Sequence, residues 1–195
     1  GVAAEGGLLS ASLTNVVDAD GTTTSSYRWQ EQTGANWSDL LGQTSHSLAI
    51  PGDQSYVNKT VRVVASSTDS LGGSTDFSST GQLIVNVNDQ PTGGVSLVGT
   101  FKQGQLLSAA NSLADADGLG PITYTWQGAN NANGTYSTLA TGVSYQLVAG
   151  DVNHYIRVVA SYTDGYGSFE SLASAASAGP VAALDSAPPT VTELT

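Results

Sequence analysis

The sequence predicts an all-β protein made of two tandem antiparallel β-sandwiches. Three observations predict this fold class. One set of motifs occurs twice, short runs of alternating apolar and polar residues recur at near-regular spacing, and no segment has the apolar periodicity of an amphipathic helix. The chain has 195 residues, of which 39% are hydrophobic. It is therefore long enough for one large or two small domains and can build a core.

The two halves of the chain carry the same motifs in the same order. Asp18 and Asp115, for example, begin the same Asp-Ala-Asp-Gly motif and lie 97 positions apart (115 − 18). This period is close to the roughly 100 residues of an immunoglobulin-like (Ig-like) sandwich, so two such modules are expected. The repeated motifs are 7–11 with 105–109, 18–21 with 115–118, 27–30 with 124–127, 61–66 with 156–161, and 68–69 with 163–164.

Proline and turn residues mark the module boundaries, because few contacts cross such segments. Module one is expected at 1–88, module two at 89–184, and a linker with the start of a further module at 185–195. Gly1 aligns with Gly99, so the first strand of module one is missing or supplied by a different phase of the repeat. Counted from Gly1 instead, the chain holds two full periods. Because the sequence does not begin with Met, we expect a fragment of a longer protein.

Each strand of module two is predicted by alternation between turn clusters of Gly, Asn, Asp and Pro. The third strand of an Ig-like sandwich carries a buried tryptophan. Trp126 and its counterpart Trp29 are therefore expected in the two cores. In chain order, the predicted strands of module two are 95–98, 105–113, 122–126, 145–147 and 155–162.

Composition excludes several classes of partner. The formal charge is −11, from 5 Lys and Arg against 16 Asp and Glu, so neither nucleic acid nor an anionic membrane is an expected partner. No apolar run approaches the roughly 18 residues of a membrane span, so membrane insertion is not expected. The absence of cysteine excludes disulfides, thiolate nucleophiles and cysteine-type zinc sites.

Acidic residues in the loops of module two predict a calcium site. Asp115 and Asp117 lie between the second and third strands, Asp164 begins the loop after the long strand, and Asn88 and Asp89 enter the first strand. These three segments share one end of a sandwich. Clustered carboxylates repel one another unless a cation lies between them, and Ca²⁺ takes 6–8 oxygen ligands from such loops. The alternative is that Asp-x-Asp-Gly is only a turn.

Module one repeats part of this pattern. Asp18, Asp20 and Asp69 match the aspartates of module two, but the positions equivalent to Asn88 and Asp89 fall before Gly1. A calcium site in module one is therefore expected to be weaker or empty. Mg²⁺ is a poorer candidate for either module, because it prefers octahedral sites that retain water.

The residues of the linker and loops resemble known repeat families. Residues 85–91 resemble the inter-domain linker of cadherin repeats, in which Asp and Asn bind calcium. Together with 114–118, 124–127 and 156–165, they resemble the Ig-like tandem repeats of giant bacterial RTX-type adhesins and related calcium-dependent secreted proteins. The resemblance covers nearly the whole chain. It implies a cadherin-like sandwich, a role as extender or spacer, and a secreted or cell-surface location in a Gram-negative bacterium.

Two departures from this repeat pattern affect the calcium prediction. The second linker, 184–188, has lost the Asn-Asp pair, which puts a site at the next junction in doubt. Glu5 offers a carboxylate from the opposite end of module one, where module two has Gln103.

The sequence offers little for catalysis. It has two histidines, His46 and His154, and neither recurs in the other copy. It contains no Gly-x-Ser-x-Gly elbow, Walker loop or His-Glu-x-x-His motif. We therefore expect no enzyme, but extender modules whose partners are neighbouring repeats of the same chain and whose junction is rigidified by calcium. The alternative is a module that binds a glycan or protein, with Trp37 and Tyr136 in the contact surface. Trp37 has no counterpart in module two by sequence, and the loop between Gln127 and Thr141 is not repeated.

Overall fold

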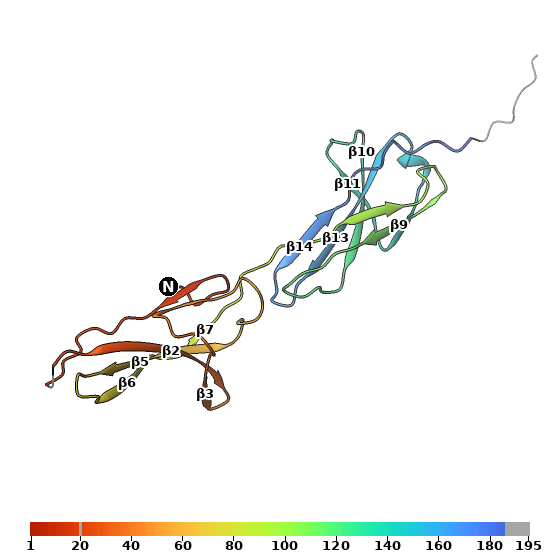
Figure 1. The fold of residues 1–195 in the computed structure, drawn as a ribbon. Coiled ribbons are helices and arrows are strands. Elements are labelled where there is room, and N and C mark those ends of the chain that lie inside the picture. Colours follow the sequence, from red (N-terminus) through yellow and green to blue (C-terminus); the bar gives the residue numbers. More distant parts are fainter. Residues whose placement is uncertain (20, 186–195) are drawn as a thin grey trace, which may run out of the picture. The chain divides into compact units, whose positions relative to one another are not determined.

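The computed structural model describes residues 1–19 and 21–185 (Figure 1). These residues form two compact units, and the chain passes from the first, Gly1–Asn88, to the second at Asp89. Beyond Asp185, the predicted linker and start of a further module at 185–195 lie outside the described residues. No helix in the described part of the chain is long and apolar enough to cross a membrane.

The second unit consists of two antiparallel sheets. One has the strand order β11-β10-β13-β14 and the other β12-β9-β8. A 3₁₀ turn, η1, spans Ala149–Asp151. The strands are β8 (Val95–Val98), β9 (Leu106–Asn111), β10 (Thr123–Ala129), β11 (Ser137–Thr141), β12 (Ser144–Gln146), β13 (Tyr155–Thr163) and β14 (Phe169–Ala173).

The two sheets of the second unit share one core. Leu107 from one sheet packs with Trp126 and Ile156 from the other, and all three side chains are fully buried. Alternation sets these positions, since every second residue of a strand points to the same face. Along β13, Ile156, Val158 and Ala160 are all fully buried. Two packed antiparallel sheets with a buried tryptophan on the third strand form an Ig-like β-sandwich, which confirms the predicted fold class.

Two strands of the second unit escape the alternation analysis. β11 lies in the segment that the sequence predicts as a loop, and β14 follows the loop after β13. Both are outer strands of their sheet and leave most of their side chains exposed. A strand that buries few side chains does not require an apolar face, so its sequence shows little of the alternation that predicts a strand.

The first unit has the same plan with fewer paired strands. β1 pairs with β4, and the other sheet has the order β3-β2-β5-β6, with β7 also pairing with β5. Figure 1 shows β2, β5 and β6 side by side. The strands are β1 (Leu8–Ser10), β2 (Thr24–Thr33), β3 (Asn36–Asp39), β4 (Ser47–Ala49), β5 (Thr60–Thr68), β6 (Ser74–Ser78) and β7 (Gln82–Leu83).

The units differ at one sheet edge. β9 pairs with β12 on one side and with β8 on the other. Its counterpart in the first unit, β1, pairs with β4, and the described part of the chain supplies no strand to its other side. Within the described residues, β1 therefore has one paired side where β9 has two.

The repeated tryptophans occupy the two cores as the sequence predicts. Trp29 is 3% exposed and Trp126 is fully buried. The indole N–H of Trp29 donates to the carbonyl oxygen of Ser45 at 3.0 Å, and that of Trp126 donates to Gly142 at 2.8 Å. Each ring therefore fills the core and also fastens the turn before the next strand.

We expect Trp126→Phe to lower the free energy of unfolding of the second unit by about 1–3 kcal/mol, because it removes the hydrogen bond to Gly142 and leaves unfilled volume in the core. Thermal and urea unfolding measure the change. Trp37→Phe is the control, because it keeps an aromatic ring at a half-buried position, and less than about 1 kcal/mol is expected there. Equal losses in the two variants would contradict this account of the core.

Candidate metal centre

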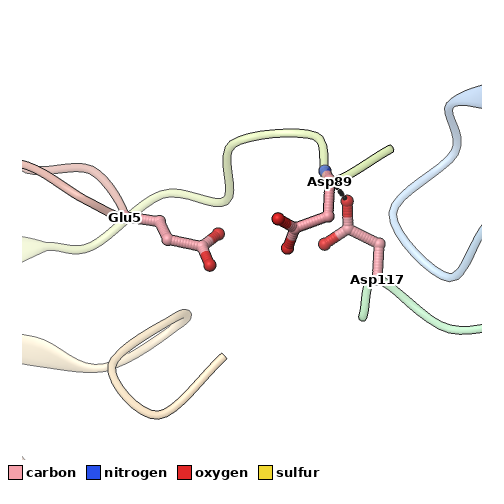
Figure 2. A group of neighbouring side chains, drawn as sticks. All are labelled: Glu5, Asp89 and Asp117. Carbon is pink, nitrogen blue, oxygen red and sulfur yellow. Dashed lines mark hydrogen bonds between the residues drawn. The ribbon is translucent and has the colours of Figure 1, made fainter. Parts of the chain in front are cut away.

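The linker is tied to the second unit by a buried carboxylate. The backbone N–H of Asp89 donates to Oδ2 of Asp117 at 2.7 Å (Figure 2). Asp117 is 3% exposed. An ionised group so far from water is stabilised by donors or cations around it. The entry to β8 and the loop between β9 and β10 are thus joined at an acidic position.

Asp115 shapes this loop. Its Oδ1 accepts the backbone N–H of Asp117 at 2.9 Å, and its Oδ2 accepts the hydroxyl of Tyr162 at 2.5 Å. The backbone then turns at Gly118, whose φ of 96° suits glycine. Burial, the bond to Asp115 and the charges of Asp115, Glu170 and Asp164 all raise the pKa of Tyr162. With both oxygens engaged, Asp115 orients the loop that carries Asp117.

The loop between β13 and β14 packs against the same turn. The backbone N–H of Gly165 donates to the carbonyl oxygen of Asp117 at 3.0 Å. A Cβ at position 165 would lie 2.6 Å from that oxygen, so only glycine allows this approach. The structure therefore brings together the three segments that the sequence predicts at one end of the sandwich.

Asp164 closes its own loop. Its Oδ1 accepts the backbone N–H groups of Tyr166 and Ser168, both at 2.8 Å. Its Oδ2 is buried and has no hydrogen-bond partner. Burial acts to raise the pKa of Asp164, but the hydrogen bonds from Ser168, Tyr166 and Gly167 outweigh it and hold that pKa below its usual value. This aspartate is therefore ionised, and it stabilises the loop between β13 and β14.

A second buried acid belongs to the first unit. Glu5 is 8% exposed. Its Oε2 accepts the backbone N–H of Val87 at 3.3 Å and the side-chain amide of Gln54 at 3.4 Å. Its Oε1 is buried and has no hydrogen-bond partner. The end of the first unit therefore also offers a buried carboxylate to the linker backbone, two residues before Asp89.

The structure confirms that Glu5 and Gln103 are equivalent positions. Gln103 Oε1 accepts the backbone N–H of Leu184 at 3.4 Å, as Glu5 accepts that of Val87. The second linker is therefore held by a neutral amide where the first is held by a carboxylate. In the sequence, the only sign that Glu5 has a special role is that the equivalent position of the second module is glutamine.

Cationic side chains lie away from the acidic end of the second unit. Every salt bridge among the described residues is in the first unit, where Arg28 pairs with Asp39 and Asp76, and Lys59 pairs with Glu31. In the second unit, Arg157 is near the start of β13. It lies roughly 20 Å from the loop after that strand, at about 3.3 Å per residue. Glu170, which sequence reasoning missed, adds a further acid at 7% exposure and pairs with Tyr162 in the sheet.

Three carboxylates near the linker are candidate metal ligands. Glu5, Asp89 and Asp117 each offer a carboxylate oxygen, the kind of donor that hard cations prefer. Within either unit alone, the described residues bring no three acidic or histidine side chains to within 4.8 Å of one another. Both oxygens of Asp115 and one oxygen of Asp164 already accept hydrogen bonds, and their part in a metal site stays a prediction. Asn88 is exposed in the linker.

The predicted acids of the first unit are arranged more loosely. Asp69 Oδ1 accepts the backbone N–H groups of Leu71 and Gly73 at 2.7 and 2.9 Å, so Asp69 closes the loop between β5 and β6 as Asp164 closes its own. Asp18 is exposed and lines the same shallow hollow of about 300 Å³ as Asp69. Asp20 lies outside the described residues. The turn alternative therefore accounts for Asp69.

Trp37 and Tyr136 are counterparts in space, which corrects the sequence interpretation. The guanidinium carbon of Arg62 lies 4.2 Å from the ring centroid of Trp37, and that of Arg157 lies 4.0 Å from Tyr136. Each arginine also donates to a glutamine of the neighbouring strand at 2.8 Å. Such stacks contribute about 0.5–1 kcal/mol at exposed sites. One face of each candidate ligand-binding ring is thus covered by arginine.

Comparison with known proteins adds little to this picture. No protein-family model matches the chain, and no curated protein is similar in sequence. Among solved structures, an amphioxus IgVJ-C2 molecule is similar, with 14% sequence identity over 87% of this chain and 97% of that chain and a TM-score of 0.34. At this identity and TM-score, the likeness says nothing about what the chain binds.

Acid should weaken the second unit partly through Asp164. Since the pKa of Asp164 is lowered by folding, its ionised form stabilises the fold fully above the unfolded value of about 3.9 and loses that effect as pH falls through the folded pKa. Asp164→Asn keeps an oxygen acceptor but cannot be protonated in this range. We expect its melting temperature to fall less than that of the natural chain between pH 5 and pH 2 in calorimetric scans. Parallel profiles would contradict the assignment.

Proposed function

We propose that the chain is a pair of non-catalytic extender modules of a secreted or cell-surface protein, with calcium bound at the linker to stiffen their junction. One observation carries the proposal: the linker backbone is hydrogen-bonded to a buried carboxylate on each side of Asn88. Glu5 of the first unit accepts from Val87, and Asp117 of the second accepts from Asp89. Both acids are more than nine-tenths buried.

The donor chemistry supports calcium. Glu5 keeps a buried oxygen that accepts no hydrogen bond, and Asp89 adds a carboxylate to the segment that joins the two acids. Ca²⁺ takes oxygen ligands at about 2.3–2.6 Å in flexible geometry, and carbonyl oxygens and waters complete its 6–8 ligands. The linker supplies such carbonyls and the amide of Asn88. Mg²⁺ would demand a stricter octahedral set.

The mechanism would be electrostatic and entropic. Without a cation, the carboxylates on the two sides of the linker repel one another, and the linker is free to sample many conformations. With the cation, Glu5 and Asp117 share one partner, so the orientation of one module relative to the other is restricted. Asp115 and Asp164 contribute by holding the loops that position Asp117 and receive the linker.

The location follows from the expected affinity. Extracellular calcium modules bind with dissociation constants on the order of 10⁻⁴–10⁻³ M, which are useful only where calcium is millimolar. The resemblance to RTX-type adhesin repeats supports the same location, and neighbouring repeats are the proposed partners. The glycan-binding or protein-binding alternative has no observation in its favour, because Trp37 and Tyr136 each stack with an arginine of their own sheet.

Calcium titration of the whole chain tests the proposal. Isothermal calorimetry should give a dissociation constant of about 10⁻⁴–10⁻³ M. With a constant of ~10⁻⁴ M, 10 mM calcium would stabilise the bound form by about 2.7 kcal/mol. EGTA should therefore lower the melting temperature.

Three variants locate the ion. Glu5→Gln, which introduces the residue found at position 103, and Asp117→Asn should each weaken calcium binding at least tenfold. Asp39→Asn removes one charge from exposed β3 and should leave binding unchanged. No heat at millimolar calcium would overturn the site. If Asp117→Asn weakened binding but Glu5→Gln did not, the ion would belong to the second unit alone and the junction role would fail.

Stiffening has its own measurement. Small-angle scattering of the natural chain should show a narrower distribution of interatomic distances with 5 mM calcium than with EGTA. Glu5→Gln should lose this difference, and Asp39→Asn should keep it. A calcium-bound chain that scatters identically in both conditions would contradict the spacer mechanism while leaving the ion site intact.

A further inference from the structure

A glutamine in the loop between β4 and β5 bridges Glu5 and the start of the linker. The side-chain amide nitrogen of Gln54 donates to Oε2 of Glu5 at 3.4 Å and to Oδ1 of Asn86 at 3.1 Å. An amide nitrogen carries two hydrogens, so it serves both acceptors at once. Gln54 and Asn86 are half-buried, and all three residues belong to the first unit.

Backbone contacts place Gln54 beside Glu5. The N–H of Gly6, the residue after Glu5, donates to the carbonyl oxygen of Pro51 at 3.0 Å, which holds the loop against this part of the chain. Within the loop, Oδ1 of Asp53 accepts the N–H of Ser55 at 2.9 Å and closes a turn around Gln54. The loop backbone therefore determines where the amide of Gln54 lies.

The two oxygens of Glu5 have different surroundings. Oε2 accepts from Gln54 and from the backbone N–H of Val87, whereas Oε1 is buried and accepts no hydrogen bond. Both bonds to Oε2, at 3.4 and 3.3 Å, are longer than the usual range of about 2.7–3.2 Å. They therefore offset little of the cost of burying the charge, but they determine which oxygen of the carboxylate is left to a cation.

The second module lacks this arrangement. Asn58 and Asn153 occupy equivalent turns, with φ of 63° and 69°. Four positions before each of them, Gln54 corresponds to Ala149 (58 − 54 and 153 − 149), which has no side-chain donor. The same module has glutamine in place of Glu5. The buried carboxylate and the amide that contacts it thus occur together in one copy and are both absent from the other.

We propose that Gln54 is a positioning residue for the cation at the linker, holding Oε2 of Glu5 so that Oε1 is presented to the ion. This inference rests on the proposed calcium function. Hydrogen-bond donors behind a metal ligand fix its orientation, and their loss typically weakens metal binding about 10–100-fold. A neutral amide orients the carboxylate without competing for it, whereas a lysine or arginine would compete with the ion. The effect of Gln54 on binding therefore passes through Glu5.

Calcium titration of Gln54→Ala, which introduces the residue found at position 149, is the first test. We expect the dissociation constant to rise about tenfold. Gln32→Ala is the matched control, because Gln32 also donates its amide to a carbonyl oxygen of the first unit, that of Gly34 at 3.1 Å, but at an exposed hairpin. Its calcium binding should be unchanged.

A measurement without calcium separates positioning from support of the fold. In EGTA, Gln54→Ala should melt within about 4 °C of the natural chain, since the bonds it removes are long. If it melts much lower, Gln54→Met replaces it, because methionine keeps the length of the side chain and lacks both N–H donors. Gln54→Met should show the same rise in the dissociation constant.

A double-mutant cycle tests whether Gln54 acts through Glu5. In a Glu5→Gln chain the carboxylate is gone, so adding Gln54→Ala should change the dissociation constant less than about twofold. The calcium-induced rise in melting temperature reports this even where binding is weak. A tenfold loss in both backgrounds would mean that Gln54 acts independently of Glu5, and would overturn the proposal.

The side-chain amide signals of Gln54 in nitrogen–proton correlation spectra give a second readout. Calcium should shift them in the natural chain and leave them in place in the Glu5→Gln chain. If the natural chain binds calcium and both Gln54 variants bind it equally well, the proposal fails while the calcium site stands. If the natural chain gives no heat at millimolar calcium, the proposed function fails and this proposal fails with it.

Discussion

Negative charge held away from water is the constraint on which the linker region depends. Asp117 and Glu5 are both nearly inaccessible, and each receives a backbone N–H from the linker. These backbone donors offset part of the cost of burying a carboxylate. The described salt bridges are elsewhere, and the surrounding loops are ordered so that amide groups face these acids. The proposed calcium ion would supply further compensation at this position.

The fold was largely predictable because burial leaves a periodic trace. β10 and β13 pass through the core, and their alternation predicts them. β11 and β14 are outer strands with exposed side chains, so tertiary pairing, rather than local pattern, defines them. The internal repeat also places Trp29 and Trp126 correctly, since a large ring on a central strand has few places other than the core.

The candidate site was predictable in location but not in detail. Sandwich topology brings the three loops to one end, as the sequence predicts. The same residue types, however, serve as metal ligands and as caps of tight turns. Sequence alone does not separate Asp164, which caps its loop, from Asp117, which faces the linker. The equivalence of Trp37 and Tyr136 is not visible in the sequence, because they lie 8 and 10 positions after their core tryptophans (37 − 29 and 136 − 126). The register of β10 with β11 also shifts after Trp126.

The arginine stacks have a consequence for the behaviour of the molecule as a colloid. The chain has 5 Lys and Arg residues; two of them lie over aromatic rings and two more pair with acids of their own unit. Most of its positive charge is thus engaged with groups of its own unit, and the net charge that the counterions surround is negative. At 0.1 M salt this repulsion extends only about 10 Å. At low ionic strength, many such modules in series would repel one another and extend as a polyelectrolyte does. At high ionic strength the repulsion is screened, and such chains could come close together as neutral chains do.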